Sequence, residues 1–344
     1  MKKSIALFTA IVVSTVLLAG CGSGNKTTTT ATANSKKLVV YSPNSEAIIN
    51  TIIPMFEKET GIKVELVSAG TGELLKRLQS EKENPYADVM FGGSRSQFVQ
   101  NPDIFQKYIS PNDKYLIDGH KNTSGYITSY IADGSVILVN TKLIGDIKIE
   151  GYADLLNPAL KGKIATADPS SSSSAFAQLT NMLLAMGGNY TSDKGWSYVK
   201  KLFANVDGKI ASGSGAAHKS VADGEYIAAL TYEDPSASYV KSKAAVKIVY
   251  PKEGTVFLDA SSAIVKGSKN VDNAKKFIDY IISKNAQDAF GSQLTNRPLR
   301  KNTKLGTYMT SMDKIKLIKE DTTYVDKNKT NIVKKYTDIF TSIK

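Results

Sequence analysis

The chain has 344 residues, of which 42% are hydrophobic and 22% are charged, and its formal net charge at pH 7 is +12. This length and composition are ordinary for a globular protein of two domains and exclude a disordered or fibrous chain. The lysines are scattered among acidic residues, without an arginine-rich stripe, so nucleic-acid binding has little support. The single cysteine excludes an intramolecular disulfide and a zinc site built from several cysteines.

The first 21 residues have the pattern of an export signal. Lys2 and Lys3 precede an apolar stretch over 5–18, which is shorter than the roughly 20 residues that span a bilayer. Small residues follow, and the combination predicts a cleavable signal peptide over 1–20 rather than a transmembrane anchor. The position of Cys21 resembles the lipobox of bacterial lipoproteins, which implies that Cys21 becomes the mature N-terminus and carries lipid.

Residues 21–37 consist mainly of Gly, Ser, Thr, Ala, Asn and Lys. A segment without large apolar residues cannot offset its ordering entropy, so we expect a flexible tether. The signal and the tether together predict an extracytoplasmic protein, held by its lipid at the outer face of the cell membrane or in the periplasm. They leave the activity open, because enzymes are tethered as well.

Strand and helix patterns alternate after the tether. They predict a strand over 37–41, a helix over 47–60, a strand over 62–67, a helix over 73–82 and a strand over 87–91. Such an order, with short loops after each strand, is typical of a parallel α/β sheet. In these sheets ligands gather at the carboxyl ends of the strands.

A second α/β region follows. The patterns predict strands over 134–139 and 164–167, a helix over 175–186, and strand-to-loop segments over 209–215 and 227–232. Strands over 246–250 and 263–266 are expected to return to the first sheet, and helices over 271–285 and from 312 to the end close the chain.

Five segments together carry a family resemblance. They are FEKETGIKV (56–64), GTGELL (70–75), ADVMFGGS (87–94), TYEDP (231–235) and YPKEGT (250–255). With the strand that ends at Ser42 and Pro43, they resemble the substrate-binding proteins of ABC importers, in the branch of ferric-ion, phosphonate, thiamine and sugar-phosphate binders. Each segment is weak alone, and the set covers nearly all of the chain after residue 37.

The resemblance implies an α/β fold of the type II periplasmic binding proteins, with two α/β lobes, two crossover hinge segments and a ligand cleft between the lobes. The implied division is lobe 1 at 38–135 and 248–290, lobe 2 at 136–247, and C-terminal helices at 291–344 that pack across the lobes. The implied hinges lie near 135–140 and 246–258. The implied protein is a monomeric receptor without a cofactor, which delivers a small solute to the permease subunits and meets the membrane only through its lipid.

The iron binders of this branch use a histidine after strand one, a glutamate after strand three and an adjacent tyrosine pair, because ferric iron prefers anionic oxygen ligands. This chain has Asn44 at the first place, Gly93 and Ser94 at the second, and an acidic pair after one tyrosine at the third. Its two histidines, His120 and His218, are predicted to be surface or loop residues. We therefore predict no metal site, and a ferric-iron receptor remains the alternative.

Ser, Thr and Gly instead gather where strands end and helices begin. A helix N-terminus binds phosphate or phosphonate through its unpaired N–H groups and its partial positive charge. The predicted ligand-binding residues are Ser42, Asn44, Thr71, Gly72, Gly93, Ser94, Ser172, Ser173, Ser174, Tyr232, Glu233 and Asp234. The alternative is that each Ser or Thr only caps its own helix. Three such sites around one proposed cleft favour a small anionic solute.

The acidic pair Glu233 and Asp234 suits the hydroxyls of a sugar, or the ammonium of an aminoalkyl phosphonate, at the other end of the solute. Sugar-phosphate binders of the branch resemble this chain in carrying such a pair; the alternative is a solvated turn before Pro235. Arg95 and Arg297 either face the anion or make surface ion pairs of about 0–1 kcal/mol.

An enzyme is not predicted. The sequence has no Gly-x-Ser-x-Gly elbow, no His-Glu-x-x-His motif, and no cysteine nucleophile beyond Cys21. Glu233 and Asp234 are adjacent, and adjacent carboxylates rarely flank a scissile bond from opposite sides. A tethered hydrolase and a surface adhesin are the weaker alternatives.

Overall fold

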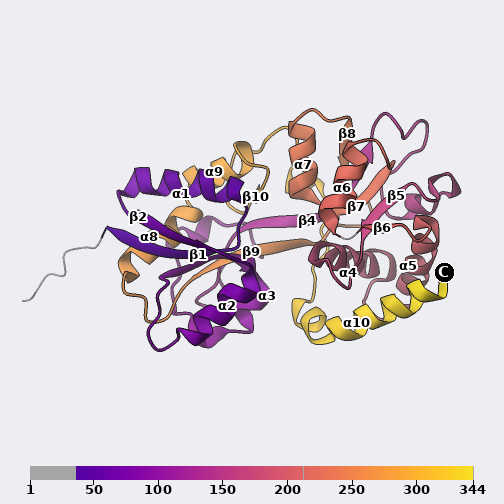
Figure 1. The fold of residues 1–344 in the computed structure, drawn as a ribbon. Helices are drawn as coiled ribbons and strands as arrows, with labels where there is room; N and C mark the ends of the chain where they lie inside the picture. The colour runs from indigo at the N-terminus through magenta and orange to yellow at the C-terminus, as the bar shows by residue number, and fades with distance from the viewer. Residues whose placement is uncertain (1–35, 212, 344) are drawn as a thin grey trace, which may run out of the picture. The chain divides into compact units, whose positions relative to one another are not determined.

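The computed structural model describes residues 36–211 and 213–343, shown in Figure 1. The predicted signal peptide, Cys21 and the tether up to residue 35 lie outside the described residues. Lys37, the last residue of the expected tether, already belongs to the first strand.

The first predicted region is an α/β unit. Its elements are β1 (Lys37–Ser42), α1 (Glu46–Thr60), β2 (Lys63–Ser68), α2 (Thr71–Ser80), β3 (Val89–Ser94) and α3 (Arg95–Val99). β1 pairs in parallel with β2 and with β3, which confirms the predicted parallel sheet. α1 ends at Gly61, whose φ of 68° is the left-handed conformation that stops a helix.

One long strand, β4 (Thr128–Asn140), pairs with strands in both parts of the sheet. Its residues Thr128 to Gly134 pair with β9 (Phe257–Ile264), and β10 (Arg297–Pro298) pairs with the same part. Its residues Ser135 to Asn140 pair with β7 (Ala228–Tyr232) and β8 (Val246–Val249). The sheet order is β2-β1-β3-β9-β4-β7-β5-β6. We call the part from β2 to β9 the first sheet half, and the part from β7 to β6, with β8, the second sheet half.

The second sheet half contains the remaining strands and four helices. They are β5 (Ile164–Ala167), α4 (Ser173–Gly187), α5 (Asp193–Val206), β6 (Ile210–Ala211), α6 (Ser214–Ala222) and α7 (Glu233–Lys241). The prediction for 246–250 was wrong in its pairing, because β8 pairs with Ile137 to Asn140 of β4 in this half. Of the two strands expected to return to the first sheet, β9 does so, and it lies between β3 and β4.

The C-terminal elements differ from the predicted ones. The helix expected over 271–285 is two helices, α8 (Val271–Ile281) and α9 (Lys284–Ser292), because the Ser283 hydroxyl accepts from the Ala286 N–H and starts a new helix. The helix expected from 312 is a single turn there (Met312–Lys314), and α10 begins later (Thr322–Ile343). Further single turns are Pro102–Ile104, Asp113–Tyr115, Ala153–Leu156 and Pro158–Leu160.

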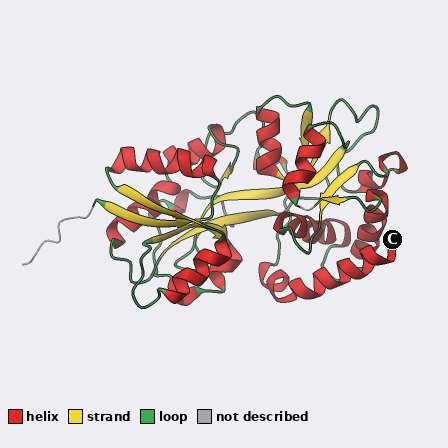
Figure 2. Ribbon diagram, in the orientation of Figure 1, coloured by secondary structure: helices red, strands yellow, loops and turns green. Residues whose placement is uncertain are grey.

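Helices cover both faces of the first sheet half, as Figure 2 shows. On one face α1, α8 and α9 enclose an aromatic core, in which the Phe56 and Phe277 ring centroids lie 5.0 Å apart. On the other face α2 and α3 pack with Leu74, Leu78 and Phe98. Burial of such side chains contributes about 1.5–3 kcal/mol each.

A second core lies in the second sheet half. α4 and α5 bury Leu179, Leu183 and Leu202 there, and α10 adds Tyr336, whose ring centroid lies 5.0 Å from that of Phe203. α10 also approaches α3 of the first sheet half. Across the described ranges, none of the helices combines the length and the apolar character that a membrane span requires.

Candidate functional site

The carboxyl end of β1 is fastened to the end of β3. The Ser42 hydroxyl donates to the Phe91 carbonyl at 2.6 Å, and Asn44 Nδ2 donates to the same oxygen at 2.9 Å. Asn44 Oδ1 accepts from the Tyr130 hydroxyl at 2.8 Å. The two predicted residues Ser42 and Asn44 therefore lie together, and their side chains hold the strand ends in place.

Gly93 brings the end of β3 against the start of α2. Its φ is +111°, a backbone conformation that residues with a Cβ rarely adopt. A Cβ built on Gly93 lies 2.8 Å from Thr71 Cγ2 and 3.3 Å from a ring carbon of Phe98. Only glycine permits this close approach, so the end of β3 lies directly against Thr71 at the start of α2, and Asn44 lies beside the preceding residue, Gly92.

We predict that Gly93→Ala is more destabilising than a glycine substitution that adds backbone strain alone. The left-handed backbone costs about 1–3 kcal/mol, and the contact with Thr71 adds to it. Gly119→Ala is the matched control, because Gly119 has a φ of +95° with nothing within 4 Å of its Cβ position. Denaturant unfolding measures the free energy of unfolding of both variants. Equal losses for Gly93→Ala and Gly119→Ala would contradict an added cost from the contact with Thr71.

The helix starts differ in whether a side chain caps them. The Ser94 side chain and the Gln97 side chain form a capping box on α3, and the Ser172 hydroxyl accepts from the Ala175 N–H of α4 at 3.3 Å. Ser94 and Ser172 therefore cap their own helices, as the alternative to ligand binding predicted. The N-cap residues of α2 and α6 are Gly70 and Gly213, which have no side-chain cap.

Two further predicted residues lie at the start of α4. Ser173 is its exposed first residue, and the Ser174 hydroxyl lies 3.2 Å from the Ser172 hydroxyl. Within the described ranges no hydrogen bond joins these serines to the predicted residues of the first sheet half.

The acidic pair begins α7, and an unpredicted residue, Asp133, holds its first turn. Asp133 Oδ1 accepts from the backbone N–H groups of Glu233 at 3.0 Å and Asp234 at 3.2 Å. Burial raises the pKa of Asp133 well above its usual range, and the charges of Asp234 and Glu233 raise it further. The start of α7 is therefore occupied by a carboxylate of the chain itself.

Glu233 and Arg297 form a buried ion pair, with side chains 1% and 2% exposed. Arg297 Nε donates to Glu233 Oε2 at 2.8 Å, and Nη2 donates to Oε1. The Tyr250 hydroxyl also donates to Glu233 Oε1. The alternative of a surface ion pair is wrong for Arg297, because Arg297 and its partner Glu233 are both enclosed. The alternative of a solvated turn is wrong for Glu233 for the same reason.

Asp234 has a different environment. Its Oδ1 accepts from the Thr295 hydroxyl at 2.6 Å, and its side chain is only half-buried. Burial raises the pKa of Asp234, and the charge of Glu233 raises it further, while hydrogen bonds from Thr295 and Asn296 lower it. Burial also raises the pKa of the neighbouring Tyr232 phenol.

The two histidines lie in different surroundings. His218 is buried in α6, with Nδ1 3.2 Å from Thr231 Oγ1, and burial lowers its pKa. The prediction of a surface position is therefore wrong for His218. His120 lies in a loop, as predicted, with Nδ1 2.7 Å from Asp259 Oδ1. Among residues 36–211 and 213–343, no three His, Cys, Asp or Glu side chains are grouped to hold a metal ion.

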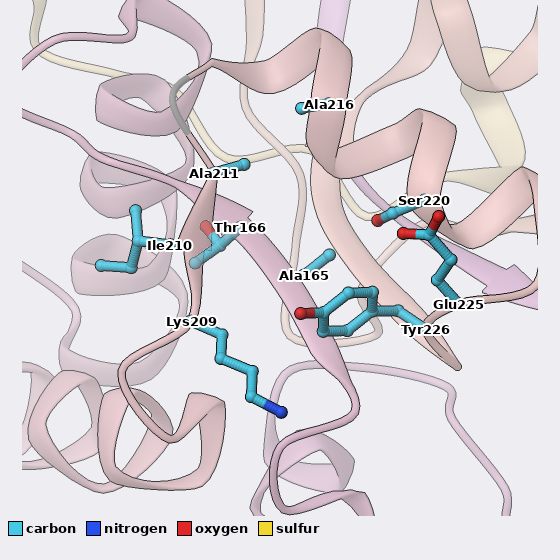
Figure 3. A pocket seen from close by; sticks show the side chains of 9 residues that line it. All are labelled: Ala165, Thr166, Lys209, Ile210, Ala211, Ala216, Ser220, Glu225 and Tyr226. Atoms are coloured by element: carbon cyan, nitrogen blue, oxygen red, sulfur yellow. The ribbon is translucent and has the colours of Figure 1, made fainter.

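A pocket of about 240 Å³ lies elsewhere, in the second sheet half. Figure 3 shows it between β5, β6 and α6, with Lys209 and Glu225 on different sides. Its lining residues are Ala165, Thr166, Lys209, Ile210, Ala211, Ala216, Ser220, Glu225 and Tyr226. None of the predicted ligand-binding residues lines it, so this pocket is not the predicted site.

Sequence reasoning missed Asp133, Tyr250 and Thr295. Asp133 gave a signal, since it is a carboxylate inside the otherwise largely apolar strand β4. Tyr250 begins one of the segments that carry the family resemblance, but its contact with Glu233, like that of Thr295 with Asp234, depends on tertiary structure.

Comparisons with known proteins agree on one family. The family model described as "bacterial extracellular solute-binding protein" matches residues 38–293. A putative 2-aminoethylphosphonate-binding periplasmic protein of Salmonella typhimurium is 25% identical over 253 residues, which cover 71% of this chain and 72% of that protein.

Solved structures give the same fold. The periplasmic binding protein AfuA from Actinobacillus pleuropneumoniae, with exogenous fructose-6-phosphate bound, has a TM-score of 0.72 at 24% identity and covers 89% of this chain and 98% of its own. A ferric binding protein from Campylobacter jejuni has a TM-score of 0.70 at 23% identity, with coverage of 88% and 99%. The predicted type II periplasmic-binding-protein fold is therefore confirmed.

Proposed function

Because this chain belongs to the family of bacterial extracellular solute-binding proteins, we propose that it captures a small phosphorylated or phosphonylated solute and delivers it to the permease of an ABC importer. The observation that carries the proposal is the start of α2, which has no side-chain cap and lies against Gly93 at the strand ends. The N–H groups and partial positive charge of such a helix start bind a phosphate without a basic side chain.

The other end of the solute meets polar groups at the start of α7. Asp234 is half-buried beside Tyr232, and its carboxylate suits a hydroxyl or an ammonium group. A sugar phosphate and an aminoalkyl phosphonate both combine such a group with an oxyanion. Similar proteins of both kinds support this class, since one has fructose-6-phosphate bound and another is a putative 2-aminoethylphosphonate-binding protein.

Ferric iron is the alternative, and a ferric binding protein is among the similar structures. Hard ferric iron prefers anionic oxygen ligands. At the strand ends of this chain the corresponding positions are amide and glycine residues, Asn44 and Gly93, and the one fully buried carboxylate of the pair, Glu233, is already matched by Arg297. These residues favour the phosphorylated solute.

Thermal unfolding of the chain from residue 37 to 344 tests the proposal. A solute at a hundred times its Kd stabilises the folded state by about 2.7 kcal/mol. We expect the midpoint to rise by about 4 °C with one member of a panel of sugar phosphates and aminoalkyl phosphonates. A rise with ferric ion, and none with any member of the panel, would favour the iron alternative.

We also propose that the protein binds its solute unchanged, as a monomer without a cofactor, and meets the membrane only through lipid on Cys21. The export signal and the extracytoplasmic family support this location. A Cys21→Ser chain is expected to leave the membrane fraction and to lack the mass of the lipid, because one change removes the acylated sulfur. Mass spectrometry of both fractions measures this, and a lipidated Cys21→Ser chain would contradict it.

A further inference from the structure

The two carboxylates of the acidic pair are not equivalent, and the difference begins with Arg297. Both oxygens of Glu233 accept from Arg297, and Oε1 accepts from the Tyr250 hydroxyl as well. The Arg297 guanidinium is itself held by the Thr310 carbonyl, to which Nη2 donates at 2.7 Å. Both Glu233 oxygens are thus hydrogen-bonded within the chain, and the side chain is enclosed, so Glu233 is not accessible to a solute.

Asp234, by contrast, has no cationic partner among the ion pairs of the described chain. Neutral groups, Thr295 and Asn296, supply its hydrogen bonds, and part of its side chain is exposed. A carboxylate has about four lone-pair positions, so Asp234 retains acceptor capacity that Glu233 has lost.

The backbone of this turn is fixed from two directions. Asp133 on β4 accepts from the N–H groups of both acidic residues, and Arg297 on β10 holds the Glu233 side chain. β10 pairs with Ala132 and Ile131 of β4, so Asp133 and Arg297 come from neighbouring strands. Together they determine where the Asp234 carboxylate lies.

We propose that Arg297 is a positioning residue of the solute site, which acts through Glu233 and leaves Asp234 as the carboxylate that receives the hydroxyl or ammonium end of the solute. This inference rests on the proposed function and assigns different roles to the two residues of the acidic pair.

The charges around Asp234 allow the proposal to be tested by pH titration. Asp234 is faced by Glu233 on its own helix, Asp133 on β4, the Tyr232 phenol on β7, and the neutral side chains of Thr295 and Asn296. Arg297 is the one cation in contact with this cluster among the described residues. Without Arg297, adjacent carboxylates hold a proton to a higher pH, as coupled carboxylates do.

Unfolding at several pH values, without solute, is the first measurement. A carboxylate whose folded-state pKa is raised contributes stability that is present at low pH and lost as the pH rises through that pKa. We expect Arg297→Met to lose stability progressively between about pH 4 and about pH 8. Asp234→Asn in the same background is expected to remove part of this pH dependence, because it removes the second carboxylate.

If Arg297→Met lowered stability equally at every pH, or if Asp234→Asn left the pH dependence of Arg297→Met unchanged, Asp234 would not be coupled to the ion pair. Either result overturns the proposal. If Arg297→Met fails to fold, the double variant Glu233→Gln with Arg297→Met is compared with the parent instead. The double variant is expected to fold, because it has no unmatched buried charge. The double variant is then expected to keep the pH profile of the parent, and a profile that moves overturns the proposal.

Solute affinity, measured by calorimetry with the phosphate ester or phosphonate that shifts the parent, separates the two carboxylates. Asp234→Asn is expected to weaken binding at least about tenfold, since a charged acceptor is lost. Glu233→Gln with Arg297→Met is expected to weaken binding by a smaller factor, about three- to fivefold, because it removes the pair that positions Asp234 but keeps the Asp234 carboxylate. An affinity equal to that of the parent would overturn the positioning role of Arg297. Equal weakening by both overturns the assignment of Asp234. A parent that binds no such solute refutes the proposed function, while the pH titration still decides the role of Arg297.

Discussion

Thr71→Pro is expected to weaken binding of the phosphorylated solute by about a hundredfold or more. The change removes the Thr71 hydroxyl and the first N–H of α2, two donors toward the anion, and each hydrogen bond to a charged group contributes about 1.5–3 kcal/mol. The helix itself is expected to remain. Proline suits the first helical position, and Gly70 before it is already extended, with a ψ of 147°.

Two controls make this prediction specific. Thr71→Ser retains both donors and is expected to bind within about threefold of the parent. Thr71→Val removes only the hydroxyl and is expected to fall between the two. Calorimetric titration gives the affinities, and denaturant unfolding checks that stability stays within about 1 kcal/mol. If Thr71→Pro bound as tightly as Thr71→Ser, the start of α2 would not be the anion site.

Arg297→Met is expected to lower the free energy of unfolding by about 3–5 kcal/mol at neutral pH, because it leaves Glu233 as a buried carboxylate without a cation. Addition of Glu233→Gln is expected to recover most of this loss, since the double variant has no unmatched charge. Denaturant unfolding at neutral pH measures both.

Arg95→Met is the matched control for the same substitution. Arg95 Nη2 makes a single exposed hydrogen bond, 3.2 Å from Thr123 Oγ1, so its loss is expected to cost about 0.5 kcal/mol or less. If Arg95→Met and Arg297→Met cost the same, the buried ion pair would contribute no more than a surface group.

Much of the fold was predictable because it depends on local patterns. The alternation of β-branched runs and amphipathic segments predicted β1 to β3 and α1, and apolar runs predicted β5 and β7. The pairing of β8 was not predictable in this way, because a short apolar strand carries no information about its partner. Ser283 resembled an ordinary helix residue, and only its bond to the Ala286 N–H identifies it as a new start.

The positions of the candidate residues were predictable where the local pattern determines them. Gly93 lies at the end of β3 and Thr71 opens α2, as the strand and helix patterns predicted. The environment of Glu233 was not, because its partner Arg297 is 64 residues away and joins it through a different strand. A buried ion pair and an exposed acidic turn have the same local sequence, and only tertiary contacts distinguish them.

The long strand β4 limits how the two sheet halves move during capture. Residues up to Gly134 hydrogen-bond to β9, and residues from Ser135 hydrogen-bond to β7, so sliding of one half along the other would break the pairing register on both sides. A twist of β4 between Gly134 and Ser135 would leave the pairing register of both parts unchanged. The Phe257 ring lies against Gly134, where a Cβ would be 2.5 Å from a ring carbon. Glycine at this residue therefore lets the Phe257 ring pack directly against the backbone where β4 changes partners, and we expect capture to change torsion angles there rather than to translate one half.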